Sequence, residues 1–261
     1  MSEALDAAEI LIFVLVGWIC GLIDGVIGVG FGVSSATILG AMGVPPLTLT
    51  TSVHASRLLI FIPSALTHYR SENYEKRLVP YLLFSGVLGE VLGVLRFIQL
   101  PARTAAIVSA LILTLMGAVI VYKVRERVDG DAERVDANLL VCVLVSFLAG
   151  FLDSICGGGW APICISTLIL LGLDARVAAG TVDVVRPITT LACTATFGVK
   201  LGMRFSWGII VMLLAGGGLA IPVARRLAGK APRKALRLMI GLWIFAVNLY
   251  RLVCYVLQAH L

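Results

Sequence analysis

The stretch "GLIDGVIGVGFG", residues 21–32, places one aspartate and five glycines inside one of the most apolar parts of the chain. A carboxylate within an apolar membrane segment is costly, and such a group usually faces a partner or a functional site. Glycine gives the backbone conformations that break a helix. The stretch therefore predicts a first apolar helix that ends at the glycines, with an aspartate that has a specific partner.

The rest of the chain has the composition of a membrane protein. Its 261 residues have a mean hydropathy of +1.01 and only 14% are charged, against about 25% in soluble domains. The runs 105–122, 138–152 and 205–223 carry no charged residue. Apolar runs of roughly 17–25 residues match the bilayer core, and uniformly apolar runs do not fit the alternating strands of a β-barrel. We expect a polytopic α-helical protein whose first apolar run, lacking a basic leader, is retained.

A second stretch, "GFLDSICGGGWA" at residues 150–161, repeats the pattern of the first. A shift of 129 positions aligns the two without a gap, so that Gly21 meets Gly150, Asp24 meets Asp153 and, further on, Arg57 meets Arg186. We predict an N-terminal repeat at 1–122, a charged linker at 123–137 and a C-terminal repeat at 138–261.

Each repeat is expected to contain five helical elements, the second of which is too short to cross a core of about 30 Å at about 1.5 Å per residue. We therefore predict an all-α fold of two inverted repeats, with glycine-broken or re-entrant first and second helices. Lys and Arg in the expected loops are in excess on the side of the linker. This places the linker in the cytoplasm and both termini outside, in the cell (inner) membrane. The expected elements are 9–26, 31–43, 46–69, 77–97, 103–122, 138–155, 160–172, 175–199, 205–225 and 234–257.

One arginine lies near the middle of the expected third helix of each repeat, Arg57 in the first and Arg186 in the second. An arginine at this depth costs about 3 kcal/mol on insertion scales and usually marks a functional site. Glycine-broken helices aim backbone N–H groups at anions, and guanidinium groups add bidentate donors. Together these features predict an anion site between the repeats. The expected substrate-binding residues are Arg57, Arg186, Gly28, Gly30, Gly157, Gly158, Gly159, Ser34, Thr51, Ser52 and Thr181.

Four further residues are expected to balance charge or couple protons: Asp24, Asp153, His54 and Asp183. Asp24 and Asp153 can pair with Arg57 and Arg186 and so lock the halves together, or one aspartate can carry a proton. His54 can relay protons near neutral pH or be a satisfied core histidine. Glu90 is an acid of the fourth element with no acidic counterpart in the second repeat, and it is another candidate proton site. The glycines of the fourth element and the six cysteines are expected to serve packing.

The chain resembles the sulfite exporter TauE/SafE family of membrane permeases, over nearly its whole length. The resemblance lies in the duplicated segments "GLIDGVIGVGFGVSSATILGAMGVPPLTLTTSV" and "GFLDSICGGGWAPICISTLILLGLDARVAAGTV", and in "ALTHYRSENYEKRLVPYLLFSGVLGEVLG". It implies transport of small anions such as sulfite, thiosulfate and organosulfonates, usually linked to protons. The paired acidic and arginine residues depart from the general family pattern and favour a subgroup with a larger organic anion, such as a sulfonate or carboxylate.

We therefore expect a secondary anion transporter that works by alternating access, with an anion channel using the same cavity as the alternative. HExxH, GxSxG and paired catalytic aspartates are absent from the sequence, so an enzyme is not expected. No cofactor or metal is expected. The net charge of +6 lies in short loops and does not indicate nucleic acid. The expected partners are a small anionic substrate and the lipid bilayer, and assembly into a homo-oligomer stays open.

Overall fold

The computed structural model describes residues 6–28, 30–125, 138–203, 205–227 and 233–257. Within this part of the chain the structure is entirely helical, as predicted, and its ten helices match the ten expected elements to within a few residues. The linker predicted at 123–137 lies largely outside the described residues, and the last helix before it runs on to Arg125. The helices are α1 Ala7–Ile27, α2 Phe31–Ala41, α3 Pro46–Arg70, α4 Val79–Phe97, α5 Ala102–Arg125, α6 Leu139–Cys156, α7 Trp160–Leu170, α8 Ala175–Leu201, α9 Trp207–Leu227 and α10 Arg233–Leu257.

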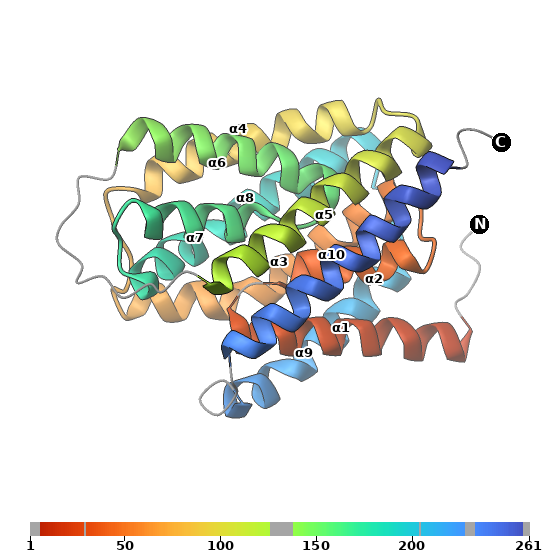
Figure 1. Ribbon diagram of the computed structural model, residues 1–261, viewed down its shortest axis with the longest axis horizontal. Coiled ribbons are helices and arrows are strands. Elements are labelled where there is room, and N and C mark those ends of the chain that lie inside the picture. Colours follow the sequence, from red (N-terminus) through yellow and green to blue (C-terminus); the bar gives the residue numbers. More distant parts are fainter. Residues whose placement is uncertain (1–5, 29, 126–137, 204, 228–232, 258–261) are drawn as a thin grey trace.

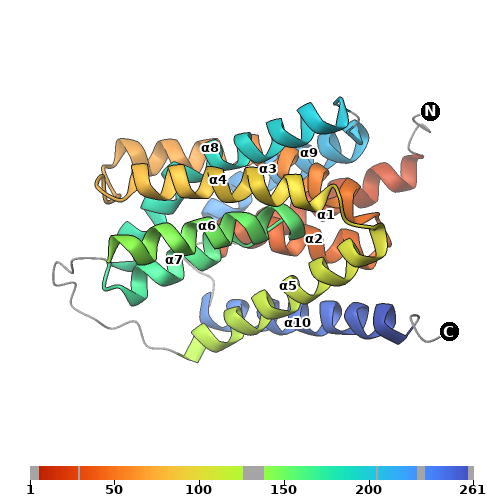
Figure 2. The same ribbon diagram turned by 90° about the horizontal axis from the view of Figure 1, so that it is seen from above.

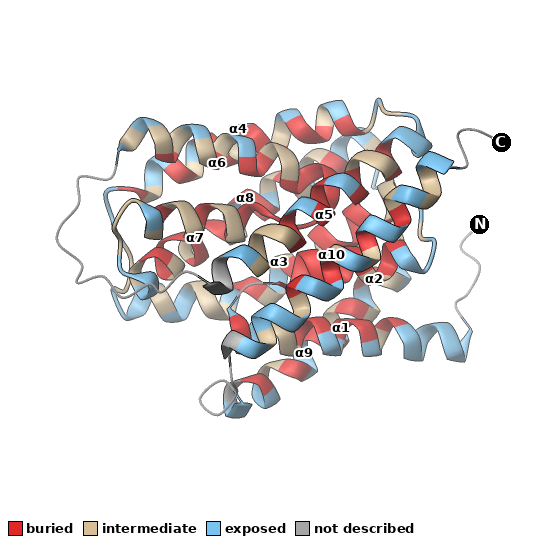
Figure 3. Ribbon diagram, in the orientation of Figure 1, coloured by how far each residue is buried: buried red, intermediate tan, exposed pale blue. Residues whose placement is uncertain are grey.

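Seven of the helices described are long and apolar enough to cross a membrane: α1, α3, α4, α5, α6, α9 and α10. The long helix α8 is not among them and carries Asp183 and Arg186 near its middle. Large apolar side chains cover the outside of the bundle, for example Phe84 and Val199, which are 74% and 82% exposed. Figure 3 shows these exposed positions along the outward faces, with buried residues gathered inside. An apolar exterior of this extent fits a protein surrounded by lipid.

The helices pack in pairs that link the two halves of the chain. The most extensive contacts are α1 with α9, α4 with α6, α5 with α10, and α3 with α8. The shift of 129 positions relates α1 to α6 and α4 to α9, so the first helix of each half packs against the fourth helix of the other. Figures 1 and 2 show α3 and α8 side by side, and the inward faces of both helices contact elements of both halves. The side chains at the centre therefore come from both halves.

Glycines allow two of these pairs to approach closely. A Cβ atom at Gly17 or Gly21 of α1 would overlap the backbone of α9. A Cβ atom at Gly89 or Gly93 of α4 would overlap the backbone of α6. Small residues at such contacts let membrane helices pack backbone to backbone. The packing role predicted for the glycines of α4 is confirmed.

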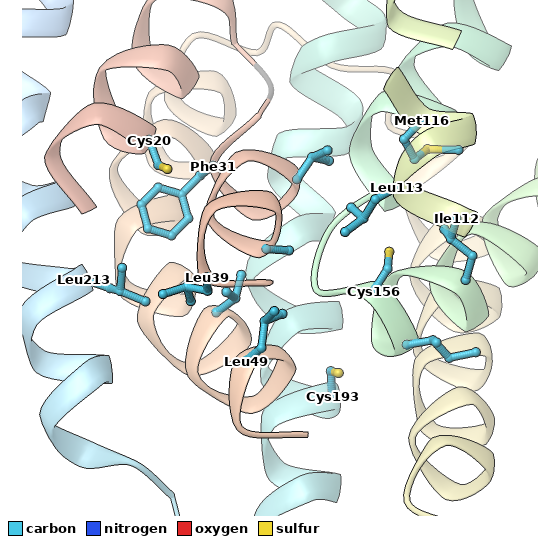
Figure 4. Close-up of a cluster of buried hydrophobic side chains, with 14 of the residues drawn as sticks. Cys20, Phe31, Leu39, Leu49, Ile112, Leu113, Met116, Cys156, Cys193 and Leu213 are labelled. Carbon is cyan, nitrogen blue, oxygen red and sulfur yellow. The ribbon is translucent and has the colours of Figure 1, made fainter. Parts of the chain in front are cut away.

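The main apolar core joins both halves around the glycine breaks. In Figure 4, Phe31 of α2, Cys156 of α6 and Leu213 of α9 contribute to one cluster. A second core cluster lies among α4, α6, α7 and α8 and includes Trp160. All six cysteines are free thiols, and all except Cys254 are buried. They fill space in the core, as the sequence suggested.

The glycines at equivalent positions of α4 and α9 provide a test of this packing. Gly89→Ala should destabilise the protein by about 1–3 kcal/mol, because the added methyl group overlaps the carbonyl of Phe147 in α6. Gly218, its counterpart in α9, has no atom near its hypothetical Cβ. Gly218→Ala should therefore be neutral or slightly stabilising. Thermal unfolding in detergent measures both, and equal effects of the two substitutions would contradict the proposed α4–α6 contact.

Candidate functional site

Both glycine stretches break the helix with the same backbone geometry. Gly28 ends α1 with φ 87°, and Gly157 ends α6 with φ 82°. Each donates its N–H to the carbonyl four residues earlier, that of Asp24 at 2.7 Å and that of Asp153 at 2.8 Å. Such left-handed conformations favour glycine at a helix C-terminus. The chain is then turned at Gly30 and Gly159, from which the short helices α2 and α7 begin.

The aspartate side chains complete the two breaks. Asp24 Oδ1 accepts the N–H of Phe31 at 3.1 Å, and Asp153 Oδ1 accepts the N–H of Trp160 at 3.1 Å. Each carboxylate thus caps the first turn of a short helix, where orphan N–H groups and the helix dipole favour negative charge. The N–H group of Phe31 is thus a specific partner of Asp24, as the sequence of residues 21–32 predicted.

The carboxylate of Asp153 also forms a buried ion pair with the other half of the chain. Arg57 of α3 donates from Nη1 to Asp153 Oδ1 at 3.3 Å, and its Nη2 contacts Asp153 Oδ2. The same Nη1 donates to the carbonyl of Gly157 at 3.2 Å. Arg57 is 5% exposed and Asp153 is 1% exposed. The pair therefore joins the third helix of the first half to the glycine break of the second.

Arg186 makes the reciprocal connection. Its Nη2 lies 3.7 Å from Oδ1 of Asp24, and its Nη1 donates to Asp183 Oδ1 at 2.9 Å. The other oxygen of Asp183 accepts a hydrogen bond from Ser64 of α3 at 2.6 Å. Each central arginine is thus paired with the aspartate of the opposite half. The geometry shows the ion-pair alternative for Asp24 and Asp153, and it adds which arginine each of them faces.

Both arginines line one small cavity between the halves. Its volume is about 20 Å³, counted as the space open to the centre of a water molecule, which is about what one water needs. Phe61 of α3 lies against the guanidinium groups, with the Cζ of Arg186 3.6 Å and that of Arg57 5.8 Å from its ring centroid. The cavity is lined by Gly30, Gly32, Val33, Arg57, Phe61, Asp153, Gly158, Gly159, Trp160, Ala161, Pro162, Arg186, Thr189 and Thr190.

The two glycine breaks touch each other beside this cavity. A Cβ atom at Gly158 would overlap the backbone of Gly32 and Val33 at the start of α2. A Cβ atom at Gly32 would lie 2.6 Å from both Arg57 Nη1 and the carbonyl oxygen of Gly157. Glycine at these positions brings the backbone of one half against the ion pair of the other.

The structure brings some of the predicted binding residues to this cavity and places others elsewhere. Arg57, Arg186, Gly30, Gly158 and Gly159 line it. Gly28 and Gly157 form the adjoining helix ends.

The four predicted hydroxyl side chains do not line the cavity. Thr51 donates to the carbonyl of Leu47 and lines a separate groove beside Lys200. Thr181 bonds to Val177 of its own helix and accepts from the N–H of Glu75. The hydroxyls of Ser34 and Ser52 are buried without a hydrogen-bond partner among the described residues.

A fully buried cluster of titratable groups adjoins the Arg57–Asp153 pair. His54 Nε2 lies 3.3 Å from Asp153 Oδ2 and 3.7 Å from Glu90 Oε2. The ligand atoms of His54, Glu90 and Cys193 lie within 4.8 Å of one another. The neighbouring guanidinium of Arg57 would repel a divalent cation at this place, and we do not assign a metal site here.

The sequence reasoning missed several residues of the site. Phe61 and Thr190 follow Arg57 and Arg186 by four positions, which is one helical turn and therefore the same face. They are also counterparts under the shift of 129 positions, as are Ser64 and Cys193. Extending the repeat alignment one helical turn beyond each arginine would have found Phe61 and Thr190, and a second turn would have found Ser64 and Cys193.

Comparisons with known proteins agree with this architecture. The family model described as "Sulfite exporter TauE/SafE" matches residues 13–251. A curated protein of Bacillus subtilis (strain 168), "Probable membrane transporter protein YtnM", is 31% identical over 246 residues, which cover 92% of this chain and 81% of the relative. No solved structure matches the chain.

A match over most of the chain and a relative of similar length both point to the same group of membrane transporters. The apolar exterior and the seven helices able to span a bilayer fit that group. The chain is a member of the sulfite exporter TauE/SafE family.

Proposed function

We propose that this protein is a secondary transporter of small anions, such as sulfite, thiosulfate or an organosulfonate, with its substrate site at the cavity between the two halves. The observation that carries the proposal is the pair of guanidinium groups, Arg57 and Arg186, on one buried cavity that two glycine-broken helices also line. Guanidinium donors and free backbone N–H groups suit the oxygens of sulfur oxyanions.

Anion binding requires a change of this arrangement. Asp153 occupies donors of Arg57, while Asp24 and Asp183 face Arg186. The cavity has room for about one water. A substrate must therefore separate the guanidinium groups from their carboxylates and widen the space. A site that opens and closes in this way fits alternating access better than a permanently open channel.

We also propose that the two halves are inverted repeats that move against each other. In Figure 1, α1 runs from the end that carries the termini toward the opposite end, whereas its counterpart α6 runs the other way. The counterparts α5 and α10 are likewise opposed. The exchanged packing of α1 with α9 and α6 with α4 supports the same organisation. In transporters of this kind the site lies at the interface of the repeats.

The transport proposal is tested in proteoliposomes that contain the purified protein. Wild-type protein should show saturable flux of sulfite, thiosulfate or methanesulfonate. Arg57→Gln alone should lower the free energy of unfolding by about 3–5 kcal/mol, because it leaves the Asp153 carboxylate buried without its guanidinium partner. The double variant Arg57→Gln with Asp153→Asn removes both charges. It should recover most of the stability and still lack saturable flux.

Arg96→Ala serves as the control, since this arginine is exposed at the end of α4. It should keep wild-type flux. Full saturable flux in the folded double variant would contradict a substrate-binding role for Arg57. Flux that rises without saturation in the wild type would favour the channel alternative.

We further propose that the linker end of the bundle is cytoplasmic and that both termini lie outside, in the inner membrane. The connection between α3 and α4 has Arg70 at the end of α3 and Lys76 and Arg77 in the loop, whereas the connection between α4 and α5 has only Arg96 in the last turn of α4 and Arg103 in the first turn of α5. A larger number of basic residues is typical of cytoplasmic loops. α4 separates these two connections, so they lie on opposite sides of the bundle.

Cysteine labelling in intact cells tests this orientation. In a Cys254→Ser background, which removes the one cysteine that is not buried, Gln99→Cys should react with a membrane-impermeant maleimide. Glu72→Cys should react only after the cells are permeabilised. Both positions are exposed. The reverse pattern would place the linker outside, and labelling of both in intact cells would contradict a membrane crossing by α4.

A further inference from the structure

Glu90 of α4 is an acid in the interior of the bundle without a hydrogen bond. The residue is 0% exposed. Neither carboxylate oxygen has a hydrogen-bond partner among the described residues, and the nearest basic group is His54 Nε2 at 3.7 Å. An ionised carboxylate in this setting costs several kcal/mol. Glu90 therefore either holds a proton or faces an imidazolium ion.

The orientation of His54 fixes where that proton lies. His54 Nδ1 is 3.0 Å from the carbonyl of Thr50. A carbonyl only accepts, so Nδ1 carries hydrogen and Nε2 is the nitrogen that titrates. Nε2 faces two carboxylates, those of Glu90 and Asp153. If Nε2 were unprotonated and both carboxylates were ionised, three hydrogen-bond acceptors would face one another. At least one proton must therefore lie among His54, Glu90 and Asp153. That proton can lie on Nε2 of His54 or on the carboxyl group of Glu90.

A charge on His54 or Glu90 affects the cavity, because neighbouring charged groups connect this cluster to the arginine that lines the cavity. The titratable and charged groups that interact electrostatically with Glu90 or His54 are Arg57 from the same helix as His54, Asp153 and Cys156 from α6, Cys164 from α7 and Cys193 from α8. Asp153 is the link, because its Oδ2 contacts both His54 Nε2 and Arg57 Nη2. Within a low-dielectric interior, a charge on His54 acts strongly on this shared carboxylate.

The central charges by themselves do not favour an anion. The two arginines face three aspartates, Asp24, Asp153 and Asp183. Adding a substrate anion to this set would increase an existing excess of negative charge. A compensating positive charge must arrive with the substrate, and the His54–Glu90 pair is the described group beside the cavity that can supply it by taking up a proton.

We propose that His54 and Glu90 form the proton-coupling site of this transporter: a proton taken up by the pair draws Asp153 toward His54, frees the guanidinium of Arg57 and admits the anion. With one shared proton the pair is neutral and Asp153 is bound to Arg57. With a second proton the pair carries one positive charge, and Asp153 shifts its hydrogen bonding to the imidazolium. The proton and the anion then leave on the same side, which restores the Arg57–Asp153 pair. This proposal rests on the proposed function.

The second half of the chain does not reproduce this device. The counterpart of His54 is Asp183, and that of Glu90 is Leu219. Asp183 is satisfied by Arg186 and Ser64. Its nearby histidine, His68, has a side chain 24% exposed to the surroundings. The duplication thus provides two arginine sites. Beside Arg57 lies a fully buried acid–histidine pair whose carboxylate lacks a hydrogen-bond partner among the described residues. This asymmetry assigns coupling to the first site.

The test uses whichever of sulfite, thiosulfate and methanesulfonate the wild-type protein transports in proteoliposomes. An imposed pH gradient, acidic on the side of the supplied anion, should drive its accumulation. Coupling of one proton to one anion supports about a tenfold concentration ratio per pH unit. Glu90→Gln should lose this accumulation yet retain exchange of labelled for unlabelled anion at equal pH, because exchange needs no net proton release.

His54→Gln should lose both accumulation and exchange, because no imidazolium can then draw Asp153 away from Arg57. Thermal unfolding in detergent reports whether each variant is folded. Glu72→Gln is the matched control, since it removes a carboxylate that is 74% exposed. It should behave as the wild type in both assays.

The outcomes distinguish a failure of the proposed transport function from a failure of the proton-coupling site alone. Absence of saturable flux of all three anions in the wild type would overturn the proposed function, and this inference with it. Saturable wild-type flux that ignores the pH gradient would overturn the inference alone. Wild-type accumulation by Glu90→Gln would do the same. So would a stoichiometric transition metal in the purified protein that is lost in Glu90→Gln, because the cluster would then hold a cation in place of a proton.

Discussion

The arrangement at the centre of this protein depends on two carboxylate–guanidinium pairs, each of which joins the two halves of the chain. Asp153 of α6 binds Arg57 of α3, and Asp24 of α1 faces Arg186 of α8. The same carboxylates cap the first turns of α2 and α7. Each aspartate therefore ties together a helix break, a short helix and an arginine of the opposite half. The position of the short helices and the state of the arginines cannot change independently.

This coupling has a direct energetic consequence for transport. A buried charge that loses its only partner destabilises a protein by about 3–5 kcal/mol. The arginines are therefore expected to exchange one anionic partner for another, the aspartate for the substrate, and not to stand unpaired at any stage. The glycines make the exchange sterically feasible, because the backbones of Gly32 and Gly158 contact each other where the two breaks meet. A movement of either break is transmitted to the ion pair beside it.

Much of this arrangement follows from the sequence and some of it does not. Long apolar runs and the position of glycines define the ten helices, because helix length and helix termination are local properties. The shift of 129 positions also identified the central arginines and aspartates. It did not identify which arginine each aspartate binds, because that pairing depends on how α3 and α8 lie between the two breaks. Thr51 and Thr181, which lie six and five positions before Arg57 and Arg186, were expected to bind substrate. They face other surroundings, because residues six or five positions apart on a helix lie on different faces.

We infer that the substrate replaces the aspartates at the two arginines. A structure determined with the transported anion at saturating concentration tests it most directly. We expect density for the anion within hydrogen-bond distance of the guanidinium groups of Arg57 and Arg186, with Asp153 turned toward His54. Anion density elsewhere, with Arg57 still bound to Asp153 and Arg186 still facing Asp24, would contradict it.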